Sequence, residues 1–276
     1  MMKYTKENPL RVMTLFSGYD SQCLALDRLK ALYPAFDYEL VAWCEIDAAA
    51  IRAHDALYPQ WAGRNIGDIA KADAKTLPDC DLVTWSFPCT DISVAGRQAG
   101  FSKDSGTRSS LAWETIRIFR EKRPKYLLME NVKALVQRKF IKDFNLLQGE
   151  LEKMGYANFA RVLNANDYGV PQNRERVFMV SILRTERDPE PLYYFPAPFP
   201  LERRLKDVLE EKVDEKYYLS DKMLEYFERV NDDKSHGHNF KPTDGGATAF
   251  TIRTAPGQRV DDNFIYDNQH PAKPRA

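Results

Sequence analysis

The sequence of 276 residues has few cysteines, no net charge and no long hydrophobic run. Its four cysteines, Cys23, Cys44, Cys80 and Cys89, show no CxxC spacing, which argues against a disulfide scaffold or a zinc site and favours a reducing compartment. No apolar stretch approaches the roughly 18 residues that span a bilayer, and the polar start MMKYTKENPLRV shows no secretory signal. We therefore expect a cytoplasmic protein with no membrane partner.

Positive and negative charges balance, with 40 basic and 40 acidic residues. This balance argues against a histone-like protein that holds nucleic acid by bulk charge. It leaves open a basic cleft on a neutral body, because phosphate contacts need only local lysines and arginines. The hydrophobic content of 43% is typical of a globular chain with one large domain, or with one large and one small domain.

Segments with strand character alternate with amphipathic segments in the first part of the chain. Strands are expected at residues 10–16, 39–44, 81–87, 125–129, 161–163 and 177–183, and helices at 21–32, 48–58, 109–123 and 140–154. This alternation predicts an α/β fold with a mainly parallel, doubly wound sheet, which binds ligands at the carboxyl ends of its strands. Proline and aromatic residues become frequent after residue 183, followed by short expected helices and a strand at 248–254. We predict two domains, 1–183 and 184–276.

The first two expected strands end in residues that suit an adenosine-like ligand. The first ends in FSGYDS, where Gly18 permits a tight turn into a helix N-terminus. The second ends in CEID, and a carboxylate at this distance from a glycine turn commonly binds a ribose hydroxyl. The structural alternative is a plain turn with Asp47 as a helix cap. Asp68 of NIGDIA could accept a hydrogen bond from an adenine amino group or could lie in a turn.

The next expected strands end in reactive side chains. In DLVTWSFPCTDIS, Cys89 follows a proline just after the strand; a buried, inert cysteine is the ordinary alternative. Glu130 follows the apolar stretch YLLM, and a thiol nucleophile with a carboxyl group that can be held protonated is a known catalytic combination. Arg174 and Arg176 of GVPQNRERVFMV either face one site from an extended chain or form a solvated basic edge.

Six short motifs occur in order over residues 10–183: FSG (16–18), CEID (44–47), GDI (67–69), FPC (87–89), ENV (130–132) and QNRER (172–176). Together they resemble the cytosine-5 DNA methyltransferases. The resemblance implies an S-adenosyl-L-methionine-dependent methyltransferase fold and double-stranded DNA as a partner. It also implies methyl transfer to C5 of a flipped-out cytosine, through a covalent adduct between Cys89 and C6 of the ring.

The resemblance further implies roles for individual residues. In catalysis, the thiolate of Cys89 adds to C6, Glu130 holds the N3 and amino edge, Arg176 contacts O2, and Arg174 supports the site. The cofactor-binding residues are Phe16, Ser17, Gly18, Glu45, Ile46, Asp68, Ile69 and Phe87. The substrate-binding residues are Pro88, Ser93, Asn131, Val132 and Gln172. No metal is implied.

A long loop, residues 90–110, follows the expected nucleophile. It contains three glycines, at positions 96, 100 and 106, and three basic residues, Arg97, Lys103 and Arg108. A basic loop with glycine hinges can close over a polyanion and exclude water, so we expect it to contact DNA phosphates. A disordered surface loop is the alternative.

Two departures from the family pattern affect the expected activity. Asp20 occupies the place of a usual second glycine, where it could cap the next helix or place a negative charge near the cofactor carboxylate. After Thr254 nothing resembles the family's returning C-terminal segment, so either the chain is truncated or another polypeptide supplies that piece. We therefore expect weak cofactor binding by the chain alone. The alternatives are a catalytically silent DNA-binding chain and an RNA cytosine-5 methyltransferase.

Overall fold

The computed structural model describes residues 3–92, 100, 102, 106–232, 240–246, 248–252 and 262–275. The chain forms two compact units. Unit 1 combines Met1–Val162 with Arg176–Phe195, and unit 2 combines Leu163–Glu175 with Pro196–Ala276. The domain limits expected from the sequence, 1–183 and 184–276, remain a prediction.

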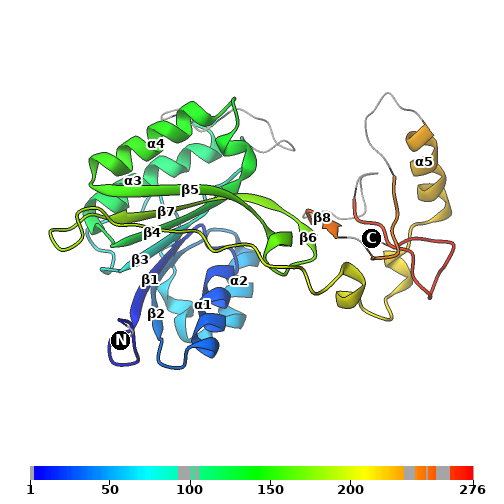
Figure 1. Cartoon of the computed structure of the whole chain (residues 1–276), viewed down its shortest axis with the longest axis horizontal. Helices are drawn as coiled ribbons and strands as arrows, with labels where there is room; N and C mark the ends of the chain where they lie inside the picture. Colours follow the sequence, from blue (N-terminus) through cyan, green and yellow to red (C-terminus); the bar gives the residue numbers. More distant parts are fainter. Residues whose placement is uncertain are drawn as a thin grey trace. The chain divides into compact units, whose positions relative to one another are not determined.

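A six-stranded sheet forms the framework of unit 1 (Figure 1). Its strands, in spatial order, are β2 (Tyr38–Cys44), β1 (Leu10–Leu15), β3 (Leu82–Trp85), β4 (Tyr126–Val132), β7 (Glu175–Leu183) and β5 (Tyr156–Asn164). The first four run parallel to one another, whereas β7 runs antiparallel to β4. The expected α/β fold with a mainly parallel sheet is confirmed.

Helices cover both faces of this sheet (Figure 1). Helices α1 (Ser21–Leu32) and α2 (Ala48–Leu57) lie on one face, and α3 (Ala112–Lys122) and α4 (Ile141–Lys153) lie on the other. Strand β1 shows why both faces are buried, because its side chains alternate between two apolar clusters. Leu10 and Val12 pack in the cluster beside α1 and α2, and Met13 and Leu15 pack in the cluster that includes Phe119 of α3.

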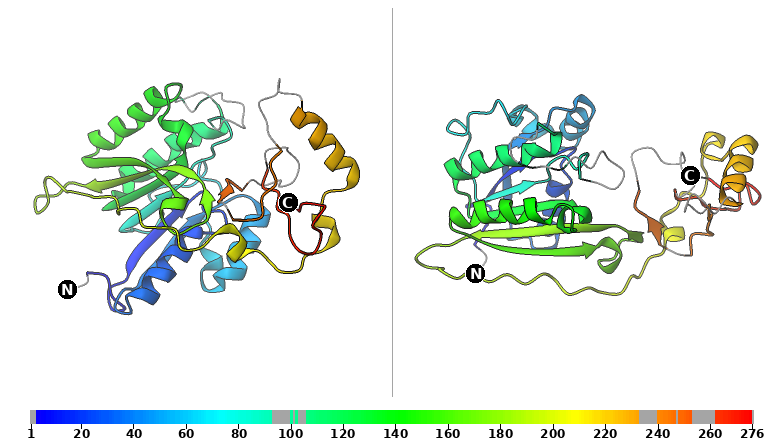
Figure 2. Two further views of the ribbon diagram at one scale, coloured as in Figure 1. Left: turned by 45° about the vertical axis from the view of Figure 1, so that its right-hand side comes forward. Right: turned by 90° about the horizontal axis from the view of Figure 1, so that it is seen from above.

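Unit 2 has less regular structure (Figure 2). It contains helix α5 (Asp221–Asp232) and a two-stranded parallel sheet of β6 (Gln172–Asn173) and β8 (Ala249–Phe250). A small core of Leu219, Phe227, Phe240 and Phe264 lies beside α5. A strand was expected at 248–254. Within its described residues, 248–252, only Ala249 and Phe250 form a strand, because they pair with the two residues of β6.

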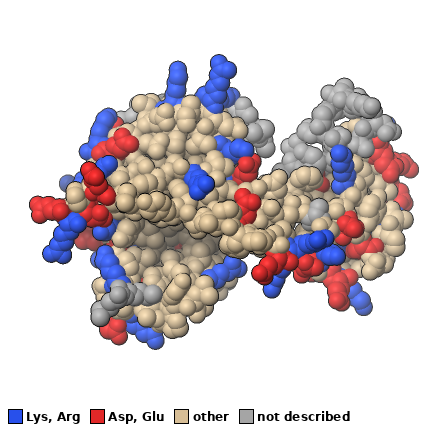
Figure 3. Space-filling model, viewed as in Figure 1, with Lys and Arg blue, Asp and Glu red and all other residues tan. Residues whose placement is uncertain are grey.

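The described surface carries charges of both signs. Lysine and arginine side chains are interspersed with aspartate and glutamate side chains on the face shown in Figure 3. This mixing agrees with the balanced composition. Among the described residues, none of the helices has the length and hydropathy needed to cross a membrane.

Candidate active site

The turn between β1 and α1, residues 16–20, has an unusual backbone. Phe16, Gly18 and Asp20 have φ values of 58°, 59° and 67°, in the left-handed region that is unfavourable for residues other than glycine. The turn is held because the Ser17 N–H donates to the carbonyl of Cys44 at 3.0 Å, and the Asp20 N–H donates to the carbonyl of Ser17 at 2.9 Å. A strained turn at the carboxyl edge of the sheet is a feature of ligand sites.

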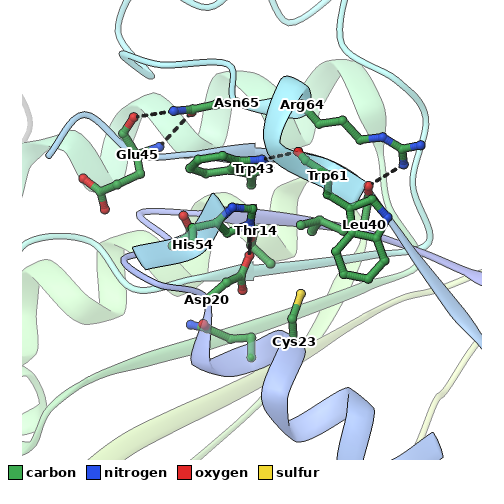
Figure 4. A network of polar contacts seen from close by, with 12 residues as sticks. Thr14, Asp20, Cys23, Leu40, Trp43, Glu45, His54, Trp61, Arg64 and Asn65 are labelled. Atoms are coloured by element: carbon green, nitrogen blue, oxygen red, sulfur yellow. Dashed lines mark hydrogen bonds and ion pairs between the residues drawn. The ribbon is translucent and has the colours of Figure 1, made fainter. Parts of the chain in front are cut away.

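Glu45 follows β2 and organises the backbone around it. Its Oε2 atom accepts from the Gly18 N–H at 2.9 Å, and its Oε1 atom accepts from the N–H groups of Ile46 and Asp47, each at 2.8 Å. Asn65 holds the Glu45 backbone by accepting from its N–H at 3.2 Å and donating to its carbonyl at 3.1 Å (Figure 4). Two carboxylate oxygens offer about four acceptor positions, so Glu45 retains capacity for a ligand hydroxyl. The Ile46 side chain beside it is 64% exposed.

Asp47 and Asp68 have the structural roles that the sequence offered as alternatives to ligand binding. Asp47 caps α2, because its side chain accepts from the N–H groups of Ala49 and Ala50. Asp68 forms a turn, since its Oδ1 atom accepts from the Ala70 N–H at 3.0 Å and its Oδ2 atom lies 3.7 Å from Lys71 Nζ.

Ile69 and Phe87, both expected to bind the cofactor, are core residues here, with 2% and 1% of their surface exposed. Both pack in the apolar cluster that includes Phe119 of α3. Their contact with a cofactor remains a prediction.

The side chain of Asp20 does not cap α1, contrary to one of the two expectations for this residue. It occupies the N-cap position, but its side chain makes no capping hydrogen bond. Instead it points into the protein, where Oδ2 accepts from Thr14 Oγ1 at 2.7 Å (Figure 4). The side chain is fully buried, so it does not place an exposed negative charge in the loop. Burial raises the pKa of the Asp20 carboxyl group above its ordinary value.

The carboxyl ends of β3 and β4 are joined by side chains. Trp85, the last residue of β3, pairs with Met129, and β4 continues past it through Glu130 to Val132. The Ser86 hydroxyl donates to Glu130 Oε2 at 2.7 Å, and the buried Asn131 side chain donates to the Phe87 carbonyl at 3.1 Å. The peptide that leads to Pro88 and Cys89 is therefore fixed to the strand that carries Glu130.

Arg176 reaches the same carboxyl group from β7. It pairs with Val132 across the antiparallel ladder, and its Nε atom lies 3.1 Å from Glu130 Oε1. The exposed fractions of the Arg176 and Glu130 side chains are 18% and 29%. A half-buried ion pair of this kind holds a carboxyl group more firmly than a solvated one does. The structure thus brings Glu130 and Arg176 together, and their roles toward a base remain predictions.

Cys89 is half-buried at the beginning of a turn. Its carbonyl accepts from the Ile92 N–H at 3.0 Å. Buried Ser109 fixes the turn from the other end of the loop, because its hydroxyl donates to the Pro88 carbonyl at 2.5 Å and its N–H donates to Asp91 Oδ2 at 3.2 Å. Ser93, Arg97 and Lys103 lie outside the described residues.

The segment Leu163–Glu175, which belongs to unit 2, contains the remaining two candidates. Gln172 begins β6. Arg174 is tied through its backbone, where its N–H donates to Asn164 Oδ1 at 3.0 Å and its carbonyl accepts from the Ala165 N–H at 3.0 Å. The expected roles of both side chains remain predictions.

Sequence reasoning missed three residues that hold the candidate site: Asn65, Ser86 and Ser109. Their bonds join segments that are far apart in sequence, and no spacing rule connects them. Only the position of Ser86 directly after an apolar strand could have drawn attention to it.

Comparison with protein families gives a match over nearly the whole chain. The family model described as C-5 cytosine-specific DNA methylase matches residues 10–269. A type II methyltransferase of Lactococcus lactis subsp. cremoris, M2.ScrFI, is 51% identical over 161 residues, which cover 58% of this chain and 44% of that protein. The orphan methyltransferase M.Rho11sI of Bacillus phage rho11s is 31% identical over 302 residues, covering 90% of this chain and 58% of that protein. The chain therefore spans about half the length of these relatives.

A solved structure supports the fold. The S. pombe Dnmt2 methyltransferase superposes with a TM-score of 0.70 at 18% identity, covering 96% of this chain and 78% of the other. The family match includes the turn at Gly18, the half-buried thiol of Cys89 and the carboxyl group of Glu130 described above. This chain belongs to the C-5 cytosine-specific DNA methylase family.

Proposed function

We propose that the chain transfers a methyl group from S-adenosyl-L-methionine to C5 of a cytosine in double-stranded DNA, through a covalent adduct on Cys89. The proposal is carried by one observation. Glu130, Ser86 and Arg176 form a connected polar group at the carboxyl ends of β3 and β4, next to the peptide that leads to Cys89.

The residues at the ends of β1 and β2 fit the cofactor. Glu45 is fixed by three backbone N–H groups and keeps an acceptor position for a ribose hydroxyl. The exposed side chain of Ile46 offers an apolar face for an adenine ring, and the turn at Gly18 lets the backbone come close to the methionine part. When bound there, S-adenosyl-L-methionine supplies an electrophilic methyl group.

The chain's own residues activate the pyrimidine. The Cys89 thiolate forms a bond to C6 of the flipped cytosine, and the electron pair displaced from the C5–C6 bond makes C5 nucleophilic. Glu130 gives a proton to N3 and accepts from the amino group, which relieves the charge that builds on the ring. After methylation, water removes the C5 proton, the Cys89–C6 bond breaks, and the proton on N3 returns to Glu130.

Arg176 and Ser86 keep the Glu130 carboxyl group in one orientation, since each holds a different oxygen. The guanidinium group has five N–H donors, so Arg176 can contact O2 of the base as well. The DNA site is proposed to be contacted or shaped by six further residues: Arg174, Gln172, Asn131, Val132, Pro88 and Ser93. Another polypeptide could complete the cofactor pocket of this chain.

The test measures methyl transfer from labelled S-adenosyl-L-methionine to duplex DNA and, separately, to transfer RNA. We expect transfer to DNA, loss of that transfer in Cys89→Ser, and a trapped wild-type adduct on DNA containing 5-fluorocytosine, because fluorine at C5 cannot leave as a proton does. Cys80→Ser is the matched control, since Cys80 precedes β3 whereas Cys89 follows it.

Full activity of Cys89→Ser would contradict the proposed chemistry. Transfer to RNA alone would assign the other substrate class. DNA binding without any transfer would indicate a catalytically silent chain.

A further inference from the structure

The buried carboxyl group of Asp20 lies directly behind the turn of residues 16–20. Its Oδ2 atom accepts from the Thr14 hydroxyl at 2.7 Å, and both side chains are completely buried. Thr14 belongs to β1, whereas Asp20 is the last residue before α1. This hydrogen bond therefore joins the two ends of the turn, and we call it the clasp (Figure 4).

The clasp is placed where the backbone needs support. Asp20 has a φ of 67° and a ψ of 57°. This left-handed conformation is unfavourable in free energy for any residue other than glycine. Aspartate and asparagine tolerate this conformation better than other such residues, because their short polar side chains form local hydrogen bonds. The hydrogen bond to Thr14 is a local bond of this kind, six residues away in the chain.

His54 of α2 closes the other side of the Asp20 pocket. Its ring is completely buried and stacks on Trp43, with ring centres 3.7 Å apart. Its Nε2 atom lies 3.8 Å from Asp20 Oδ2, which is too far for a hydrogen bond. Among the described residues, neither His54 Nε2 nor Asp20 Oδ1 has a hydrogen-bond partner. A buried carboxyl oxygen without a hydrogen bond costs folding free energy.

We propose that Asp20 is a positioning residue for the cofactor, which holds the turn of residues 16–20 in its binding conformation through the hydrogen bond to Thr14. The inference rests on the proposed function, because it takes this turn as the place where the cofactor binds. The turn presents the Gly18 N–H to Glu45, so a change in the turn displaces Glu45 as well. Aspartate at position 20 thus supports the site that a second glycine would otherwise shape.

The test compares the dissociation constant for S-adenosyl-L-methionine, measured by calorimetry on the full chain, in matched variants. Asp20→Gly tolerates the positive φ but loses the clasp, and we expect its affinity to fall about tenfold. Thr14→Val removes the donor with little change in shape and is expected to act in the same direction. Asp20→Asn keeps an acceptor oxygen and tolerates the conformation, so we expect its affinity to stay within about threefold of wild type.

Tyr38→Phe is the control for a merely structural effect. It removes a hydroxyl that donates to Asp27 Oδ1 at 2.7 Å and to the Cys23 carbonyl at 3.2 Å, both in helix α1, so that neither lost hydrogen bond is made to residues 16–20. We expect Tyr38→Phe to lower the melting temperature without changing cofactor affinity. Amide hydrogen exchange at Ser17, Gly18 and Asp20, measured without cofactor, is expected to accelerate in Asp20→Gly and Thr14→Val but not in Tyr38→Phe.

Unchanged affinity and unchanged exchange in Asp20→Gly would overturn the inference. An equal loss of affinity in Tyr38→Phe would also overturn it, because the effect would then be one of general stability. If the wild type neither binds the cofactor nor transfers methyl groups, the proposed function fails. In that case the exchange rates still decide whether Asp20 holds the turn.

Discussion

The two halves of the sheet's carboxyl edge are built differently. At the ends of β1 and β2, Glu45 is held by three backbone N–H groups. At the carboxyl ends of β3 and β4, where β7 begins, Glu130 is held by two side chains, those of Ser86 and Arg176. In the first half a change of conformation in the turns would move the acid, whereas in the second half a single side-chain substitution would do so.

This difference predicts two kinds of defect. Substitutions in the half around Glu130 should lower kcat, because they disturb groups that face the reacting base. Substitutions in the half around Glu45 should raise KM for the cofactor, because they loosen a preformed binding surface. Four measurements test this difference between the two halves.

The largest effect is expected for Glu130→Gln. The amide cannot exchange a proton with the base as a carboxyl group does, so we expect kcat to fall by about 10²- to 10⁴-fold, with KM for the cofactor unchanged. Glu114→Gln is the matched control, because Glu114 forms an exposed ion pair with Arg117, three residues further along the chain. Steady-state methyl transfer to DNA measures both variants. A large rise in KM for the cofactor would erase the contrast between the two halves.

Glu45→Gln should show the opposite kind of defect. Loss of the charge weakens its hydrogen bonds to the backbone and to a ribose, so we expect the cofactor dissociation constant to rise by about 10- to 100-fold, with kcat at saturation nearly unchanged. Glu39→Gln lies on the same strand, where Glu39 pairs with Arg64 at 2.7 Å, and it should leave the affinity unchanged. Calorimetry gives the affinity, and a fall in kcat alone would contradict the assignment.

Ser86→Ala is expected to give a smaller defect of the first kind. It removes one of the two side chains that orient Glu130, and we expect kcat to fall about tenfold at constant cofactor KM. Ser110→Ala is a suitable control, since the Ser110 hydroxyl donates to the carbonyl of Thr107, three residues earlier in the chain, at 2.6 Å. Equal activity of wild type and Ser86→Ala would mean that Arg176 alone suffices to hold the carboxyl group.

The smallest effect concerns pH. Burial raises the pKa of Asp20 above its ordinary value of 3.8, so the native protein holds this proton more tightly than the unfolded chain does. Its stabilising contribution is complete below pH 3.8 and is lost as the pH rises through the native pKa. Asp20→Asn avoids the cost of ionisation, so its stability relative to wild type should increase with pH.

The groups that face Asp20 are Thr14, Cys23 and His54. Urea unfolding of both proteins between pH 4.5 and 8 measures the difference. A difference that shrinks as pH rises would show that the carboxyl group is not destabilised by burial.

Much of the framework of unit 1 could be predicted from the sequence. The apolar runs gave β1 and β2 within one residue, and helix α1 was expected at its observed limits, 21–32. Periodicity succeeds here because both faces of the sheet are buried and each helix begins after a clear break. It could not show that β7 runs antiparallel to β4, because strand direction depends on which distant segments pair.

The sequence motifs indicated candidate residues for the site but not the hydrogen bonds that connect them. Motif order indicated Glu45, Cys89 and Glu130, since each follows an apolar strand. The inward turn of Asp20 could not be foreseen, because a polar residue before a helix normally caps it. Its actual partner, Thr14, lies within a buried strand and carries no motif of its own.

The direction of β7 has a practical consequence. Because β7 is antiparallel to β4, its first residues, and not its last, reach the reactive edge, where Arg176 lies opposite Val132. Its far end, Leu183, is bonded to the Lys125 carbonyl at the other edge of the sheet. Inserting one residue within β7 would therefore shift the guanidinium group out of register with its carboxylate, whereas a tag or domain inserted after residue 184 would leave the reactive edge intact.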